Sequence, residues 1–296
     1  MSMHQMKQHF NQPRLLIIGC GDVGQRMLPI LVKSHKVYVL TSQTEKLPLF
    51  RQAGAHPLFG NLDDQSTLHR LSQIADTVIH LAPPNPNGTT DLRTKSLIQA
   101  LSKGRRVKRF IYISTTGVYG DCGGQLISET QAVQPQNLRA VRRVDAERQL
   151  RAWAIKLGVS VVILRVPGIY AGNRLPVDRL QKGTPALLES EDVFTNHIHA
   201  DDLARLTILS MYRASSQRVI NACDNSDLKM ADYFDLVADK MNLPRPPRVD
   251  KETLKTLVSP QLLSFMQESR RISNARLQEI GFQFLYPTVQ DFLEQL

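Results

Sequence analysis

The sequence has few cysteines and no hydrophobic run long enough to cross a membrane. Its cysteines, Cys20, Cys122 and Cys223, are odd in number and about a hundred residues apart, which fits neither a disulfide framework nor a metal site. No stretch approaches the roughly 18 apolar residues of a transmembrane helix. The polar residues 1–13 lack the hydrophobic segment of a signal peptide, and we expect them to form a flexible tail. We therefore expect a protein of the reducing cytoplasm, with no membrane partner and no metal ligands.

Acidic residues are also scarce, because 27 Asp and Glu stand against 37 Lys and Arg, a net charge of +10. A basic balance favours anionic partners, but charge alone does not choose between nucleic acid, a membrane surface and phosphorylated small molecules. The densest basic run, residues 103–109, lacks interleaved aromatic residues and precedes a predicted buried strand. We expect it to be a solvated loop, and we expect no specific nucleic-acid binding.

In other respects the composition is that of a globular protein, with 42% hydrophobic and 22% charged residues. A chain of 296 residues is long enough for one large domain or two intimate ones. Short β-branched runs alternate with helical stretches as far as Val166, as in parallel βαβ units. We expect strands at residues 14–18, 36–40, 56–59, 77–81, 109–114, 160–166 and 218–222, and helices at 22–34, 90–103, 138–157 and 200–212.

This alternation predicts an α/β fold, a doubly wound Rossmann-type parallel sheet of about seven strands with a small C-terminal substrate-capping region. We expect the Rossmann domain at residues 14–170 plus 200–223, and the capping region at 171–199 plus 224–296. Open α/β sheets bind their ligands at the carboxyl ends of the strands, where the strand order reverses. The substrate is therefore expected to be a small molecule bound beneath the cap.

A glycine loop, Gly19-Cys20-Gly21-Asp22-Val23-Gly24, directly follows the first predicted strand and opens a helix. In that context G-x-G-x-x-G is a dinucleotide-binding signature. Gly19 permits the tight turn, Gly21 lets the backbone approach a pyrophosphate, and Gly24 lets the helix pack closely on the strand. The helix N-terminus, from Asp22 and Val23 onward, presents unpaired N–H groups to the phosphates.

The end of the second strand bears on the choice of cofactor. An Asp or Glu there hydrogen-bonds the ribose 2′-hydroxyl of NAD, but this chain has Leu40-Thr41-Ser42-Gln43 and no acid before Glu45. The absence of a carboxylate removes the repulsion of a 2′-phosphate, for which Arg26 and Lys46 are candidate partners. We therefore expect NADP in preference to NAD, with Thr41 and Ser42 beside the ribose, while NAD stays open.

Further segments complete a resemblance to a known family. In order and spacing, residues 60–64, 80–82, 113–120, 165–170 and 196–202, together with the glycine loop, resemble the NAD(P)-dependent epimerase/dehydratase family of extended and atypical short-chain dehydrogenase/reductases. The resemblance extends over nearly the whole chain from Arg14. It implies that Thr115 replaces a substrate-facing catalytic serine or threonine. It also implies cofactor contacts from Asn61, Leu62, Leu81, Ala82, Pro83 and Pro167.

The sequence differs from the family pattern in the helix that carries the family's catalytic residues. The family carries a Tyr acid/base, a Lys four residues later and a Glu after another four, and counting back from Glu147 puts Arg143 at the Lys position and Arg139 at the Tyr position. Residues four apart share one helix face. Arg143 could still donate to a ribose hydroxyl, whereas Arg139 cannot release a proton at pH 7.

Three interpretations follow for this site. Tyr119 or Tyr170 could supply the proton, Arg139 could be an electrostatic clamp for an anionic substrate or oxyanion, or the site could bind NADP without chemistry. The first two favour an NAD(P)-dependent oxidoreductase or epimerase-type enzyme acting on a small carbonyl or hydroxyl substrate. The third favours a non-catalytic NADP-binding sensor or interaction protein. Family members often pair through this helix, so a homodimer is also expected.

Overall fold

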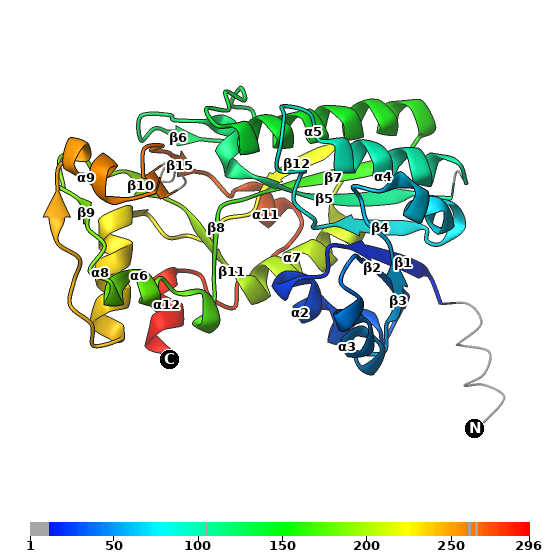
Figure 1. The fold of residues 1–296 in the computed structure, drawn as a ribbon, viewed down its shortest axis with the longest axis horizontal. Coiled ribbons are helices and arrows are strands. Elements are labelled where there is room, and N and C mark those ends of the chain that lie inside the picture. The colour runs from blue at the N-terminus through cyan, green and yellow to red at the C-terminus, as the bar shows by residue number, and fades with distance from the viewer. Residues whose placement is uncertain (1–11, 105, 260–261, 264–265) are drawn as a thin grey trace. The chain divides into compact units, whose positions relative to one another are not determined.

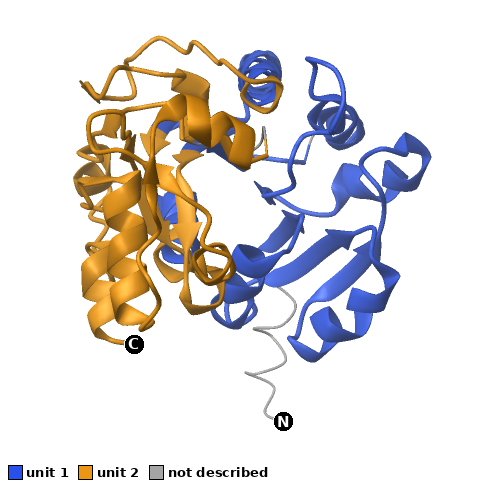
Figure 2. Cartoon of the chain, turned by 60° about the vertical axis from the view of Figure 1, so that its left-hand side comes forward, with its two compact units in different colours: residues 1–114, 141–164, 204–219 blue, residues 115–140, 165–203, 220–296 orange. Residues whose placement is uncertain are grey.

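The computed structural model describes residues 12–104, 106–259, 262–263 and 266–296. Most of the predicted tail at residues 1–13, and Arg105 of the basic run, lie outside the described residues. The chain forms two compact units, coloured separately in Figure 2. Unit 1 comprises Met1–Ser114, Val141–Leu164 and Ala204–Val219, and unit 2 comprises Thr115–Ala140, Arg165–Leu203 and Ile220–Leu296. These units divide the chain at other points than the predicted domain boundaries, which stay a prediction.

The central sheet has seven strands in the order β12-β7-β5-β4-β1-β2-β3 (Figure 1). Its strands are β1 (Arg14–Ile18), β2 (Lys36–Thr41), β3 (His56–Phe59), β4 (Thr77–His80), β5 (Arg109–Thr115), β7 (Ser160–Val166) and β12 (Arg218–Asn221). The pairs β1–β2, β1–β4, β2–β3 and β4–β5 are all parallel. The strand order reverses on either side of β1, as in a doubly wound sheet. The predicted fold class is confirmed.

The helices connect these strands and form much of unit 2. They are α2 (Asp22–Leu31), α3 (Leu47–Gln52), α4 (Leu92–Ser102), α5 (Leu138–Leu157), α6 (Val177–Gln181), α7 (Ala200–Arg213), α8 (Met230–Lys240), α9 (Lys251–Leu257), α11 (Arg276–Glu279) and α12 (Val289–Glu294). Short 3₁₀ helices are η1 (Thr44–Lys46), η2 (Gln65–Gln73), η3 (Thr116–Tyr119) and η4 (Gly172–Arg174).

The remaining strands are only two or three residues long. They pair as β6 (Leu126–Ile127) with β15 (Arg271–Ile272), β8 (Gly168–Tyr170) with β11 (His197–His199), β9 (Ala186–Leu187) with β14 (Arg248–Val249), and β10 (Phe194–Thr195) with β13 (Leu228–Lys229).

The core of unit 1 is mostly aliphatic. Leu16, Ile18 and Val78 of the sheet pack with Leu97 of α4 and Leu150 of α5 in one buried cluster, and Figure 1 shows both helices alongside the strands. Strand β1 is buried from its second residue to its last, because helices cover both faces of a parallel sheet. This buried strand leads directly into the glycine loop.

The core of unit 2 contains more aromatic and titratable side chains. Tyr170, Phe234 and Phe292 belong to its buried cluster, and His197 and Asp224 are buried as well. Buried polar groups need partners or change their protonation state. Burial therefore shifts the pKa of both groups, downward for His197 and upward for Asp224.

Candidate functional site

The glycine loop joins β1 to α2, and its first two glycines meet different surroundings. Gly19 has φ +78°, and a Cβ placed on it would come within 2.6 Å of the Ala82 backbone nitrogen, so only glycine fits. Gly21 is the N-cap of α2, so no side chain of the N-cap residue caps the first N–H groups of this helix. A Cβ on Gly21 would meet nothing within 4 Å. Open space therefore lies in front of Gly21, at a helix N-terminus suited to phosphate.

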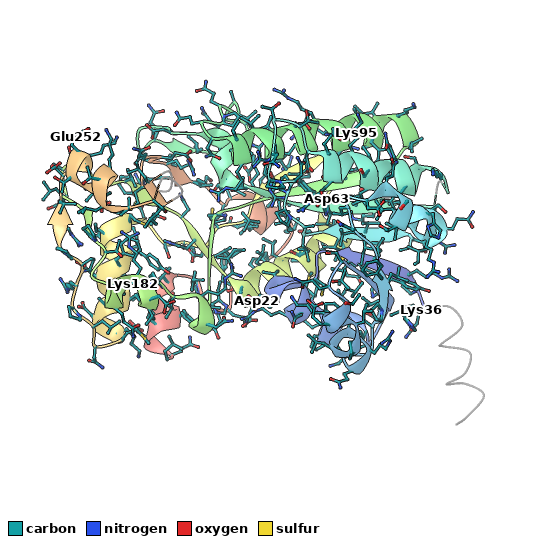
Figure 3. All side chains as sticks on the ribbon, viewed as in Figure 1. Asp22, Lys36, Asp63, Lys95, Lys182 and Glu252 are labelled. Carbon is teal, nitrogen blue, oxygen red and sulfur yellow. The ribbon has the colours of Figure 1, made fainter. Side chains whose placement is uncertain are left out.

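The rest of the loop holds α2 against the sheet. A Cβ on Gly24 would lie 2.9 Å from Cys20 Sγ and 3.1 Å from Leu81 Cδ1, so the third glycine permits close helix packing. Asp22, labelled at the start of α2 in Figure 3, accepts a hydrogen bond from Arg26 Nε at 3.1 Å. Arg26 is thus engaged by its own helix.

A cavity of about 300 Å³ opens at this end of unit 1. Among the residues predicted to hold a cofactor, Gly19, Gly21, Thr41, Ser42, Asn61, Leu62, Ala82 and Pro83 line it. Asp22, Val23, Gly24 and Leu81 are outside the lining, where they form the first turn of α2 and its packing against the sheet. The structure thus brings together the ends of β1, β2, β3 and β4, as the motif spacing predicted.

The charge in this cavity is positive. Its lining contains Lys46 and Arg93 and no Asp or Glu. Arg93 is engaged by Asp63 through two hydrogen bonds of 2.8 and 2.6 Å, whereas no carboxylate of the described residues pairs with Lys46. Burial raises the pKa of the Cys20 thiol to about 12, and the Lys46 charge opposes that shift. The ammonium group of Lys46 is therefore near enough to influence the glycine loop.

Helix α5 is attached to the end of β5 within unit 1. Arg143 Nη1 donates to the Ile113 carbonyl at 2.7 Å and to the Tyr112 hydroxyl at 3.0 Å. One turn later, the buried Glu147 accepts the Ser114 hydroxyl at 2.7 Å. These bonds fix the orientation of the Arg143 guanidinium.

Unit 2 contains a second cavity, also of about 300 Å³. Three of the predicted site residues, Thr115, Arg139 and Pro167, line it. Thr115 accepts the Gly117 amide at 3.2 Å and so caps η3. Asn137 accepts the Ala140 amide at 2.9 Å, which places Arg139 in the first turn of α5. The structure brings these three residues together. Pro167 and Arg143, both predicted to contact the cofactor, are outside the lining of the unit 1 cavity.

Comparison with known proteins agrees with this geometry. A sequence model of the NAD dependent epimerase/dehydratase family matches residues 15–223. The chain belongs to this family. Among individual family relatives, GDP-6-deoxy-D-mannose reductase of Pseudomonas aeruginosa is 25% identical over 245 residues, which cover 76% of this chain and 79% of the reductase.

Two solved structures extend the comparison with this family. A functionally unknown conserved protein from Silicibacter pomeroyi superposes with a TM-score of 0.80 at 26% identity, covering 96% of this chain and 98% of that one. A UDP-glucose 4-epimerase from Thermotoga maritima, solved with UDP-glucose, has a TM-score of 0.77 at 18% identity and covers 95% and 96% of the two chains. At that identity the second likeness shows the fold alone.

The two tyrosines considered in place of the family's acid/base are buried away from the unit 2 cavity lining. Tyr119 is 1% exposed, its hydroxyl donates to Asn221 at 2.7 Å, and the Arg165 guanidinium lies 4.7 Å from its ring centre. Burial raises its pKa. Tyr170 is also 1% exposed, and burial, together with the neighbouring Asp224 carboxylate, raises its pKa. The geometry therefore gives neither phenol a route to a substrate in that cavity.

Several cavity residues escaped the sequence analysis. They are Asn137, Arg179, Glu268 and Arg270. They come from the start of α5, from α6 and from loops of unit 2, and no motif connects them. Only their positive balance could have been noticed, as part of the net charge of the chain.

The described residues contain neither a metal-binding cluster nor a membrane-spanning helix. They contain no group of three His, Cys, Asp or Glu side chains placed to hold a metal ion. No helix among them is both long and apolar enough to span a membrane.

Proposed function

We propose that this chain is an NAD(P)-dependent oxidoreductase or epimerase-type enzyme that prefers NADP(H) and acts on a small carbonyl or hydroxyl substrate. The observation that carries the proposal is the unit 1 cavity, with open space before Gly21 and only positive charge in its lining. Membership of a family described as NAD dependent supports the cofactor class.

The residues present fit a dinucleotide. Gly21 leaves room for a pyrophosphate at the uncapped start of α2, where the helix N-terminus favours negative charge. Thr41, Ser42 and Lys46 form the end of β2 and the segment after it, where a 2′-phosphate would find a cation and no repelling acid. Asn61 and Leu62 would contact the adenine end. When bound, the nicotinamide would supply or accept the hydride.

The chain's own residues would provide orientation and charge. Arg143, fixed by two acceptors on β5, would hold the cofactor ribose in the place of the family's Lys. Thr115 would donate to a substrate oxygen in the unit 2 cavity. Arg139 would stabilise negative charge on the substrate or on a developing oxyanion, an effect worth about 3 kcal/mol for one donor.

The cofactor preference is tested by calorimetry. NADPH should bind about tenfold more tightly than NADH, a difference of about 1.4 kcal/mol. Lys46→Ala should remove most of that preference because Lys46 is the lining cation without a carboxylate partner. Lys36→Ala is the matched control, since Lys36 lies at the start of β2 and outside the cavity lining. Tighter binding of NADH to the wild type would refute the preference.

A second candidate is a non-catalytic NADP-binding sensor or interaction protein. The observation that favours it is the arginine at the family's Tyr position, together with the burial of Tyr119 and Tyr170. A sensor would keep the unit 1 cavity and need no proton donor. Fold alone cannot decide between the two functions.

Arg139 variants distinguish the enzyme from the sensor. Aldehydes, ketones and sugar nucleotides are screened with NADPH on the wild type, Arg139→Lys and Arg139→Tyr. If Arg139 is a clamp, both changes lower the turnover seen with the wild type, because one loses the planar fork and the other loses the charge. If the site is silent, the wild type turns over nothing and Arg139→Tyr alone gains weak reduction. Turnover by the wild type that is unchanged in Arg139→Ala would contradict both the clamp hypothesis and the silent-site hypothesis.

The other expectations stay proposals. We propose a cytoplasmic enzyme that pairs as a homodimer and has a small-molecule partner. Binding to a mixed-sequence DNA duplex should be non-specific and should disappear as salt rises, since counterion release would be its source. Sequence-specific binding at physiological salt would overturn this proposal.

A further inference from the structure

The unit 2 cavity combines an apolar wall with positive charge. The apolar part consists of Phe194, Met230, Phe234, Leu262 and Met266. The charged residues in the lining are three arginines, Arg139, Arg179 and Arg270, and one acid, Glu268. A volume of about 300 Å³ is at the lower end of the range for small-molecule pockets. The cavity therefore suits a small ligand with both an apolar and an anionic part.

The single acid is already paired. Glu268 accepts Arg270 Nη1 at 2.7 Å and Asn137 Nδ2 at 3.1 Å, and its side chain is 8% exposed. Burial lowers the pKa of His197 to about 3, so this lining residue is neutral at pH 7. Arg270 is thus engaged by Glu268, and the other two arginines of the lining are Arg139 and Arg179.

The N-terminus of α8, whose first residue Met230 lies in the lining, does not provide an anion site. The Met230 amide donates to the Val193 carbonyl at 2.9 Å. The Ala231 amide donates to the Asp192 carboxylate at 3.0 Å. Because these two amides are satisfied, the cationic groups that can recognise an anion here are arginine side chains.

Arg179 has the geometry of a ligand-binding arginine. Its guanidinium carbon lies 4.1 Å from the centre of the Phe234 ring, and its nitrogens are 3.5 and 3.6 Å from Met266 Sδ. The Pro185 carbonyl accepts Nη2 at 2.6 Å, and no carboxylate of the described residues pairs with the group. Burial lowers its pKa to about 10, so the group is charged at pH 7. Met266 Sδ faces both Nη atoms, but a thioether is only a weak acceptor, and Nε is buried without a partner. A carboxylate that displaces this sulfur from the Nη1–Nη2 edge therefore gains two N–H donors.

We propose that the unit 2 cavity binds an organic acid, with its carboxylate on the Arg179 guanidinium and its apolar part against Phe234 and Met266. A carboxylate matches the planar fork of arginine in two parallel hydrogen bonds. A phosphate ester, with its second charge and third oxygen, would need further donors such as the α8 amides, which are taken. This inference rests on the proposed function in treating the cavity as the substrate site, and it narrows the substrate to a carboxylate-bearing carbonyl or hydroxyl compound.

The test measures binding, which does not depend on turnover. 3-Phenylpropionate, its neutral amide, phenyl phosphate and UDP-glucose are titrated into the full chain by calorimetry at pH 7, with and without NADP⁺. We expect the acid to bind at least tenfold more tightly than the amide, phenyl phosphate and UDP-glucose. An amide that binds as well as the acid, or tighter binding of phenyl phosphate or UDP-glucose, would overturn the proposal.

Variants assign the effect to Arg179. Arg179→Met keeps a long side chain against Phe234 and should abolish the preference for acid over amide, whereas Arg179→Lys should keep part of it. Arg174→Met is the matched control, because Arg174 is exposed on η4 outside the lining and should leave the preference intact. A preference that persists in Arg179→Met, with the fold verified by circular dichroism, would overturn the assignment. Phe234→Leu should weaken binding of the neutral amide as well as of the acid, because both lose the aromatic wall, and an unchanged affinity for the amide would contradict the placement of the apolar part.

The two proposals fail separately. If wild-type protein binds the acid but neither NADP⁺ nor NAD⁺, the proposed function is wrong and the organic-acid site stands. If it binds NADP⁺ but no acid, the site inference is wrong and the proposed function stands.

Discussion

The cavity of unit 1 lies at a glycine loop and the carboxyl ends of parallel strands, whereas the cavity of unit 2 is lined by arginines and apolar residues from helices and loops. In unit 1, glycine creates the space, and the group expected to meet a ligand is a helix N-terminus. In unit 2, arginines and apolar side chains from α5, α6, α8 and several loops enclose the space. This difference predicts that ligand binding in unit 1 is lost when a side chain is added to a glycine. Ligand binding in unit 2 is lost when an arginine is replaced by a neutral residue.

The two units also contain carboxylates that burial and pairing affect in opposite ways. Asp224 of unit 2 is 4% exposed, and burial raises its pKa to about 7. Asp63 of unit 1 has a side chain that is 44% exposed, and its hydrogen bonds with Arg93 lower its pKa. Ionised Asp224 should therefore destabilise the fold, whereas ionised Asp63 should stabilise it.

The largest expected effect separates the first two glycines of the loop. Gly19→Val should destabilise the fold by more than about 4 kcal/mol, because positive φ is strained for a β-branched residue and its Cβ would overlap the Ala82 backbone. Gly21→Val should change the free energy of unfolding by less than about 1 kcal/mol, since its Cβ meets nothing. Urea unfolding of both variants measures the difference.

The same two glycine variants also test whether the unit 1 cavity binds the pyrophosphate. Gly21→Val, although folded, should bind NADPH at least 100-fold more weakly, about 2.7 kcal/mol, because its side chain occupies the space kept for the pyrophosphate. A folded Gly21→Val protein with normal NADPH affinity would show that the unit 1 cavity is not the dinucleotide site. A stable Gly19→Val protein would contradict the packing of Gly19 on Ala82.

The two cavities also differ in how well the sequence predicts them. The unit 1 site was predictable because its residues belong to one contiguous loop and to strand ends that βαβ connectivity brings to one edge. The unit 2 site was predictable at Thr115, Arg139 and Pro167 and at other lining positions of the same family segments, such as Asn196 and His197. Arg179 and Glu268 are about ninety residues apart, and the strands that bring them together are too short to show periodicity. Nor does the pattern Val-Tyr-Gly reveal that Tyr119 is buried under Arg165.

The next effect concerns Asp224. Its pKa rises from 3.8 to about 7 in the folded state, so the folded protein resists ionisation that the unfolded chain undergoes. Stability from this group is complete below pH 4 and is lost as pH rises toward 7, up to about 4 kcal/mol for a shift of about three units. Asp224→Asn can still accept the Ser226 amide and should be more stable than wild type at pH 8 by a large part of that amount.

Urea unfolding at pH 4, 6 and 8 tests this sign. The difference in unfolding free energy between Asp224→Asn and wild type should grow with pH in favour of the variant. The neighbouring groups that also sense Asp224 are Tyr170, Tyr233, Asp202 and Cys223, whose pKa burial raises so that its thiol stays protonated. Because the phenols stay protonated in this range, the change between pH 4 and 8 belongs to the carboxylate. A difference that does not change with pH would show that Asp224 ionises normally.

The smallest effect concerns Asp63, labelled in Figure 3, and its two hydrogen bonds with Arg93. Here the folded pKa is lowered, so the stabilisation is present above the unfolded pKa of 3.8 and is lost as pH falls through the folded value. The pair is partly exposed, with side chains 23% and 44% accessible, and solvent screening limits Asp63→Asn to a loss of less than about 1 kcal/mol at pH 7. That loss should nearly vanish in 1 M NaCl, where the screening length is about 3 Å, whereas the effect of Asp224→Asn should persist. If the Asp63 effect survives 1 M NaCl unchanged, this surface pair would be as shielded as the buried carboxylate, and the contrast between the two units would not hold.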